Sequence, residues 1–254
     1  MNLRKHIPNA LTCANLLCGC YACILALSGH YFGAMIAIFT ASGFDFLDGM
    51  AARLLKVCSP IGKDLDSLAD LVSFGVAPGM LLFDFMDRMQ KTAEWSPPVC
   101  GKLFLLAAGA IPVFSALRLA RFNNDTRQST HFIGLPVPAH AIFWASLLYI
   151  ITPFASAAVY AGGLAGKIPV SSLLEIPPVY VLTVAALLAI GSSLLLVSNI
   201  SMFSLKIKSL GWKGNELRYL FLAAAIVLMV CLGFSGITVS ILLYILLSIF
   251  NKHT

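Results

Sequence analysis

Four aspartates occupy positions where the surrounding sequence is apolar. Only 11% of the residues are charged and 59% are hydrophobic, so these acids do not belong to an ordinary solvated face. An Asp at the centre of a membrane helix costs about 2.5 to 3.5 kcal/mol, and clustered carboxylates repel one another unless cations join them. Carboxylate oxygens suit Mg²⁺ or Mn²⁺, and two such ions can clamp a phosphoryl group during transfer. We therefore predict a dinuclear metal site. The pattern, D-x2-D-G-x2-A-R-x8-G-x3-D-x3-D, comprises Asp45, Asp48, Gly49, Ala52, Arg53, Gly62, Asp66 and Asp70.

The spacing places each pair of aspartates on one face of a helix. Asp45 and Asp48 are separated by three positions, and Asp66 and Asp70 by four, which are the separations of neighbours on a helix surface. The Ser-Pro-Ile-Gly segment at residues 59–62 predicts a break that makes the two helices antiparallel neighbours. We therefore expect the four carboxylates to converge.

Small residues beside the acids predict room for a ligand. Gly49 and Ala52 lie on or beside the face that carries the first two aspartates, which leaves space for a flat nucleotide or a diphosphate. Gly62 permits close backbone approach, and Arg53 can grip phosphate oxygens with two hydrogen bonds. Small residues also serve helix packing in membranes, and intramembrane acids also line ion pathways. A cation transporter is therefore an alternative from a different class.

The elements that must position these residues are transmembrane helices. A mean hydropathy of +0.89 and repeated apolar runs of about 20 residues place the chain in a bilayer. The runs lack the two-residue alternation of a membrane barrel, so the predicted fold class is all-α and integral to the membrane. We expect a single catalytic domain over residues 1–254 with about eight spans. These spans cover approximately 8–27, 31–55, 66–87, 100–121, 136–161, 176–198, 216–233 and 236–251.

The distribution of Lys and Arg predicts the orientation. Cytoplasmic loops carry an excess of these residues, and placing both termini in the cytoplasm puts 13 of the 17 Lys and Arg on that side. The metal site then faces the cytoplasm. The net charge of +6 is explained by this topology and by contact with anionic membrane lipids, and no nucleic-acid partner is expected. The start of the chain does not look like a transit leader, which favours the cytoplasmic (inner) membrane of a bacterium or archaeon.

The aspartate pattern resembles the signature of the CDP-alcohol phosphatidyltransferase family. Members of that family are membrane enzymes that displace CMP from a CDP-linked donor with an alcohol, using two divalent cations. The resemblance implies a six-helix core at about residues 5–210, a C-terminal two-helix hairpin at about 216–251 and a homodimer. It also implies that Asp45, Asp48, Asp66 and Asp70 bind the metals and that Asp70 is the catalytic base. The residues it places around the CDP group are Gly49, Ala52, Arg53, Gly62, Thr12 and Asn15.

Within the family, the chain resembles the integral-membrane branch that uses L-serine as acceptor and CDP-diacylglycerol as donor. The segments that carry this resemblance are 7–15, 65–78, 118–123 and 134–139, whereas residues 198–206 follow that branch only loosely. Another acceptor, glycerol 3-phosphate or an inositol compound, is the nearest alternative. Residues hypothesised to hold the serine carboxylate or a donor phosphate are Lys63, Arg118, Arg121 and Asn123.

Overall fold

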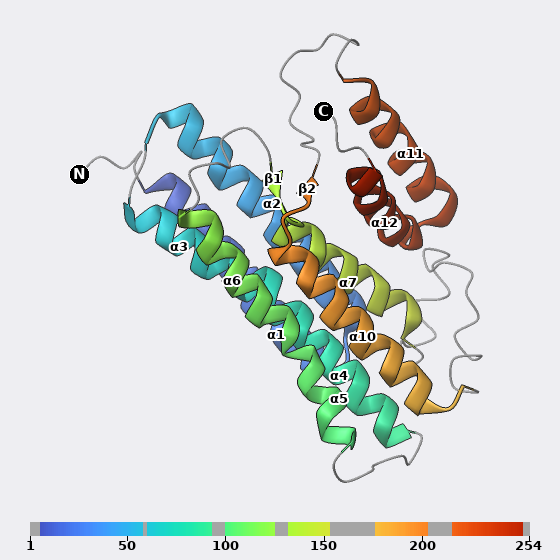
Figure 1. Ribbon diagram of the computed structural model, residues 1–254. Coiled ribbons are helices and arrows are strands. Elements are labelled where there is room, and N and C mark those ends of the chain that lie inside the picture. Colours follow the sequence, from blue (N-terminus) through green and yellow to red (C-terminus); the bar gives the residue numbers. More distant parts are fainter. Residues whose placement is uncertain are drawn as a thin grey trace.

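The computed structural model describes residues 6–57, 60–92, 100–124, 132–152, 176–202 and 215–250. Helices dominate these residues (Figure 1). The elements are α1 (Ile7–Leu27), α2 (Tyr31–Leu55), α3 (Pro60–Asp70), the π-helix η2 (Leu71–Val76), α4 (Ala77–Thr92), α5 (Cys100–Ala108), α6 (Ala110–Asn124), β1 (Phe132–Ile133), α7 (Val137–Ile151), α10 (Pro178–Val197), β2 (Ser201–Met202), α11 (Glu216–Leu232) and α12 (Phe234–Phe250).

The helices from α1 to α10 form one elongated bundle, and α11 and α12 lie as a pair on its flank (Figure 1). The pair is attached through α12, which contacts α7. Ser146 of α7 and Thr238 of α12 are joined by a hydrogen bond of 2.8 Å between their hydroxyls. The ring of Phe234 lies 5.9 Å from that of Phe32 and 5.6 Å from that of Tyr149. The predicted C-terminal hairpin therefore packs on the core through both aromatic and polar contacts.

Five helices in the described part are long and apolar enough to cross a membrane, and α7 and α12 are shorter apolar helices. The all-helical prediction is thus confirmed. Of the eight predicted spans, five correspond to long candidates and two to shorter apolar helices, whereas the span predicted at 216–233 corresponds to α11, which is not among them. Within the predicted span 136–161, residues 153–161 lie outside the described part. The five candidates are Ile7–Leu27, Tyr31–Leu55, Ile61–Lys91, Gly101–Asn124 and Pro178–Val197.

The third span differs from its prediction in where it begins. The helix starts at Pro60, whereas the sequence pattern predicted a start at 66 and a turn that included Gly62. Proline suits the first position of a helix, because it lacks an N–H that would have no partner there. Gly62 consequently lies in the first turn of α3 rather than in the connection.

The π-helical segment η2 directly follows Asp70 and is held tightly from two sides. A Cβ at Gly19 of α1 would lie 2.7 Å from Cα of Ser73, so only glycine permits this approach. On the other side, a Cβ at Gly75 would lie 3.1 Å from Cβ of Ser115 in α6. Such π-helical turns often occur at functional sites, and this one lies next to the acids.

A two-stranded ribbon was not predicted. Phe132 pairs with Met202 and Ile133 with Ser201 in antiparallel register. Gly134 follows β1 with φ of 77°, a conformation that favours glycine. Its N–H donates to the carbonyl of Ile200 at 2.9 Å. The ribbon places the start of α7 beside the end of α10, at the same end of the bundle as the end of α6.

Candidate active site

Three of the four aspartates converge between α2 and α3. Asp45 and Asp48 come from the last part of α2, and Asp66 comes from α3. One carboxylate oxygen from each lies within 4.8 Å of the others. Asp48 is buried, and Asp45 and Asp66 are half-buried. The predicted convergence is confirmed for this trio.

Asp70 lies beside the trio but is not a member of it. The residue ends α3 and is 8% exposed. Its carboxylate is close enough to interact electrostatically with the three others. Its Oδ1 accepts a hydrogen bond of 3.0 Å from Nδ2 of Asn15 in α1. A metal-ligand role for Asp70 therefore stays a prediction, whereas its contact with α1 is a feature of the structure.

Helix α1 supplies a hydrogen-bond donor to a second aspartate as well. The hydroxyl oxygen of Thr12 lies 2.7 Å from Oδ2 of Asp48 and 3.0 Å from the carbonyl of Pro8. Thr12 and Asn15 are both buried. The resemblance assigned these two residues to the CDP group. In the structure they contact carboxylates, which gives them the geometry of groups that orient metal ligands.

The donor set fits divalent cations. Oδ1 of Asp66 is buried and has no hydrogen-bond partner among the described residues. The nearest cations in the sequence do not neutralise the trio, because Arg53 donates from Nε to the carbonyl of Gly49 and Lys63 donates to the carbonyl of Asn123. Within the described residues, the ion pairs involve other acids. Three neighbouring carboxylates that form no ion pair among the described residues can bind a metal ion through their oxygens. Oxygen ligands are those that Mg²⁺ and Mn²⁺ prefer.

A cavity of about 250 Å³ adjoins the trio. Small residues keep it open, since Gly49, Ala52 and Gly62 all lie on its wall. Asn9 and Val57 also line it and were not among the predicted site residues. Asn9 precedes Thr12 by three positions, so the helical spacing from Thr12 could have indicated it. The other predicted residues on the wall are Thr12, Asp48, Lys63 and Asp66.

Lys63 and Asn123, two of the predicted acceptor contacts, form a tie between α3 and the end of α6. Nζ of Lys63 donates to the carbonyl of Asn123 at 2.8 Å, and Nδ2 of Asn123 donates to Oγ of Ser67 at 2.7 Å. Ser67 in turn donates to the carbonyl of Lys63 at 3.2 Å. The tie fixes the segment of α3 that carries Asp66.

The two predicted arginines also make contacts within the protein. Arg118 is 5% exposed, donates from Nε to the carbonyl of Leu135 at 2.9 Å and lies over the ring of Phe122. Arg121 donates to the carbonyl of Val197 at 2.9 Å. These contacts join α6 to the ends of α7 and α10. A substrate contact for either arginine stays a prediction.

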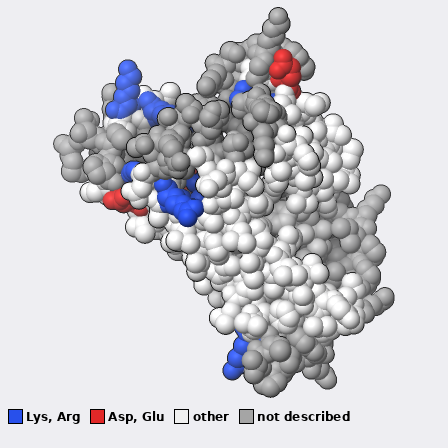
Figure 2. Space-filling view, in the orientation of Figure 1, with Lys and Arg blue, Asp and Glu red and all other residues white. Residues whose placement is uncertain are grey.

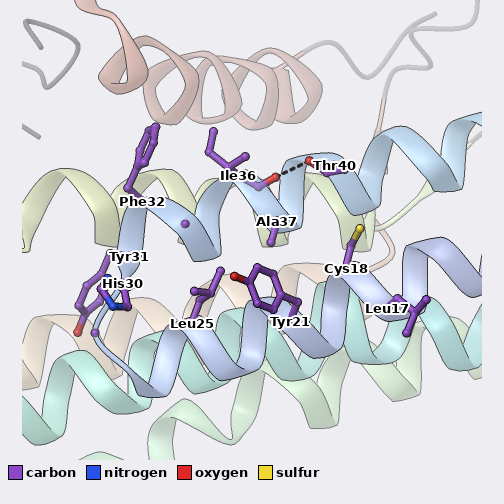
Figure 3. A pocket seen from close by; sticks show the side chains of 12 residues that line it. Leu17, Cys18, Tyr21, Leu25, His30, Tyr31, Phe32, Ile36, Ala37 and Thr40 are labelled. Carbon is purple, nitrogen blue, oxygen red and sulfur yellow. Dashed lines mark hydrogen bonds between the residues drawn. The ribbon is translucent and has the colours of Figure 1, made fainter.

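A larger cavity of about 780 Å³ lies elsewhere, in the groove between α1 and α2 (Figure 3). Its wall includes Leu17, Tyr21, Leu25 and Ile36, and no carboxylate lines it. Its wall is mainly apolar and carries no cluster of acids, whereas Asp48 and Asp66 line the smaller cavity, so the smaller cavity is the candidate active site.

On the face shown in Figure 2, several basic side chains lie at one end of the molecule and a smaller basic patch lies at the other, with an uncharged band between them. Arg53 and Lys56 at the end of α2 and Lys63 at the start of α3 lie at the aspartate end. At the other end, Arg88 and Lys91 are paired with acids at 2.7 and 2.6 Å. The exposed Lys102 near the start of α5 also lies at that end. Among the described residues, more basic side chains without an ion pair therefore lie at the aspartate end, and the side of the membrane that this end faces stays a prediction.

These features define an integral-membrane helical protein with a carboxylate site that can hold a divalent metal. Residues 5–170 match the model of the CDP-alcohol phosphatidyltransferase family, and the chain belongs to that family.

Similar proteins come from several organisms. A CDP-diacylglycerol–serine O-phosphatidyltransferase of Bacillus subtilis is 36% identical over 149 residues, which are 59% of this chain and 78% of that protein. The enzyme of the same name from Mycobacterium tuberculosis is 32% identical over 205 residues, 72% of this chain and 68% of that protein. An archaetidylserine synthase of Methanothermobacter thermautotrophicus is 32% identical over 152 residues, 59% of this chain and 60% of that protein.

Replacing Thr12 by Val is expected to weaken binding of Mn²⁺ by about 10- to 100-fold, the usual cost of losing a group that orients a metal ligand. The substitution removes the hydroxyl that contacts Asp48 and keeps the side-chain volume. Titration of the purified protein with Mn²⁺, followed by the electron paramagnetic resonance signal of the free ion, measures the affinity. Thr40→Val is a matched control, because Thr40 is exposed on α2, lies away from the aspartates on the wall of the larger cavity, and its hydroxyl donates to the carbonyl of Ile36. Equal affinities in all three proteins would contradict the orienting role of Thr12.

Proposed function

We propose that this protein transfers the phosphatidyl group of CDP-diacylglycerol to the hydroxyl of L-serine, producing phosphatidylserine and CMP. The carboxylate trio of Asp45, Asp48 and Asp66 beside a cavity kept open by small residues is the observation that carries the proposal. Family membership supports the reaction type. The choice of serine is supported by relatives that are named for a serine or archaetidylserine product.

In the proposed reaction, Asp70 takes the proton of the serine hydroxyl. The serine oxygen forms a bond to the phosphorus that carries diacylglycerol, and the bond from that phosphorus to the phosphate oxygen of CMP breaks. CMP leaves with the electron pair of the broken bond. Two divalent cations held by the aspartates would supply electrostatic stabilisation of the diphosphate charge. Nδ2 of Asn15 holds Asp70 in place for the proton transfer.

The donor binds by its head group in the smaller cavity. Gly49, Ala52 and Gly62 leave space for the CDP group, and Arg53, exposed one turn from Gly49, is positioned to reach a phosphate. The acyl chains stay in the bilayer while the head group reaches the aspartates. Lys63, Arg118, Arg121 and Asn123 are the proposed contacts for the serine carboxylate or a donor phosphate.

The proposal includes an orientation and an assembly. The aspartate end faces the cytoplasm, where serine and CMP exchange with solvent, and both termini lie on that side. The charge distribution supports this orientation. The functional unit is a homodimer by family resemblance, with one catalytic domain per chain over residues 1–254.

The test is CMP release by the purified protein in detergent with CDP-diacylglycerol and Mg²⁺ or Mn²⁺. L-Serine, glycerol 3-phosphate and inositol are compared as acceptors, and we expect release with L-serine. CMP release with a different acceptor would show that serine is not the substrate, while the proposed type of reaction would stand. If no acceptor supports release, cation flux into liposomes tests the transporter alternative, and flux without CMP release would overturn the proposal.

A further inference from the structure

The side-chain amide of Asn15 contacts the proposed base, Asp70, through its nitrogen, and its oxygen is an acceptor without a partner among the described residues. Its Nδ2 donates to Oδ1 of Asp70 at 3.0 Å, and the residue is 0% exposed. Its Oδ1 is also buried and has no hydrogen-bond partner among the described residues. Buried polar atoms are nearly always hydrogen bonded. An open acceptor beside the base therefore points to a ligand that supplies a donor.

The position of this open acceptor is well defined. An ionised carboxylate only accepts hydrogen bonds, so the NH₂ group of Asn15 is the part of the amide that faces Asp70. The amide oxygen therefore points away from that hydrogen bond. The backbone of Asn15 is also held, because Oγ of Ser73 donates to its carbonyl at 3.0 Å. Gly19 allows this contact by bringing α1 close to η2. The side-chain amide and the backbone carbonyl of Asn15 are thus both held in place relative to Asp70.

The chemistry of the acceptor substrate fits this arrangement. In L-serine the hydroxyl and the amino group are on adjacent carbons, so a hydroxyl placed at Asp70 brings the ammonium group near Asn15. An ammonium group only donates hydrogen bonds, and a site with four aspartates favours a cation. The ammonium group would make a charge-assisted hydrogen bond to Asn15, whereas a hydroxyl of glycerol 3-phosphate or inositol would make a neutral one. Charge-assisted hydrogen bonds are roughly twice as strong as neutral ones.

We propose that Oδ1 of Asn15 accepts a hydrogen bond from the ammonium group of the acceptor, so that Asn15 selects an amino alcohol. This inference rests on the proposed function and adds a determinant of its acceptor specificity. Asn15 then has two roles in one amide: its NH₂ group positions the base, and its oxygen recognises the substrate.

The test compares L-serine with 3-hydroxypropanoate, which lacks only the amino group. The value of kcat/KM is measured for each, or the inhibition constant of the analogue against L-serine if its turnover is slow. The wild type is expected to prefer L-serine, and Asn15→Ala is expected to reduce that preference by about tenfold or more, the effect of losing a hydrogen bond to a charged group. Both compounds meet the same base and donor, so general damage to the site cancels in the ratio.

Two further variants separate the roles of Asn15. Asn15→Asp keeps an acceptor oxygen and loses the donor to Asp70, so it is expected to lower kcat while the preference for L-serine remains. Ser115→Ala is the matched control, because Ser115 is buried and its hydroxyl has no partner among the described residues, yet it lies on α6. Its preference is expected to equal that of the wild type.

Several outcomes would overturn the inference. An unchanged preference in Asn15→Ala, in an enzyme that uses serine, would overturn it and leave the proposed function intact. Weaker Mn²⁺ binding with an unchanged preference would assign Oδ1 to the metal and would also overturn it. A wild type without serine-dependent CMP release would overturn the proposed function, and the inference with it.

Discussion

Replacing Asp70 by Asn is expected to lower serine-dependent CMP release by about 10²- to 10⁴-fold, the range for loss of a general base. The variant keeps the size of the side chain and an oxygen that can still accept the hydrogen bond from Asn15. The fold is therefore expected to persist, while the group that takes the proton is lost. Steady-state kinetics measure the effect, and it is expected in kcat, with KM for CDP-diacylglycerol changed little.

The matched control for this variant is Asp64→Asn. Asp64 lies on the same helix but is exposed. Its substitution is expected to leave kcat within about twofold, because surface changes away from the site have small effects. If Asp70→Asn retained more than a tenth of the wild-type kcat, Asp70 would not be the base.

Removing a member of the trio is expected to abolish most metal binding. For Asp66→Asn we expect Mn²⁺ affinity to fall by more than about 100-fold, because supporting groups alone are worth 10- to 100-fold. CMP release should fall in parallel, and added chelator should abolish it in the wild type. Oδ1 of Asp66 is buried and has no hydrogen-bond partner among the described residues, so in the absence of metal these residues compensate its charge poorly.

The same substitution is expected to raise the thermal stability of the metal-free protein. Asp66→Asn removes repulsion among three carboxylates within 4.8 Å of one another, so the chelator-treated variant is expected to unfold at a higher temperature than the chelator-treated wild type. Added Mn²⁺ should raise the melting temperature of the wild type only, because a ligand stabilises the state that binds it. Thermal unfolding in detergent measures both. A melting temperature that rises equally with Mn²⁺ in both proteins would show that Asp66 does not bind the metal.

The sequence alone predicted much of the candidate site, because local rules governed those parts. The spacing of Asp45 and Asp48 requires one helix face, and the length of the apolar runs requires membrane helices. Both follow from the geometry of a single helix. The clustered carboxylates predicted metal ions, the resemblance to the family indicated CDP, and the matching of residues 5–170 confirmed the family.

Contacts between distant residues were beyond these local rules. Asn15 and Asp70 are separated by 55 positions and Thr12 and Asp48 by 36, so only the packing of α1 against α2 and α3 brings them together. The π-helix η2 was also not predicted, because its geometry depends on neighbours that approach at Gly19 and Gly75. Arg118 could be placed at a helix end from the sequence, but its contact with Leu135 depends on the segment between β1 and α7, which is distant in the sequence, and its burial depends on the packing of the helices.

The amino-acid sequence by itself determined the membrane-helical class, the capacity of the acids to bind a metal ion and their pairing on helix faces, since each depends on composition or on spacing within one helix. The tertiary structure decided which aspartates converge, which residue holds the proposed base and which buried polar atoms have no partner among the described residues. These properties are set by contacts between helices, where a shift of one helical turn would exchange every partner.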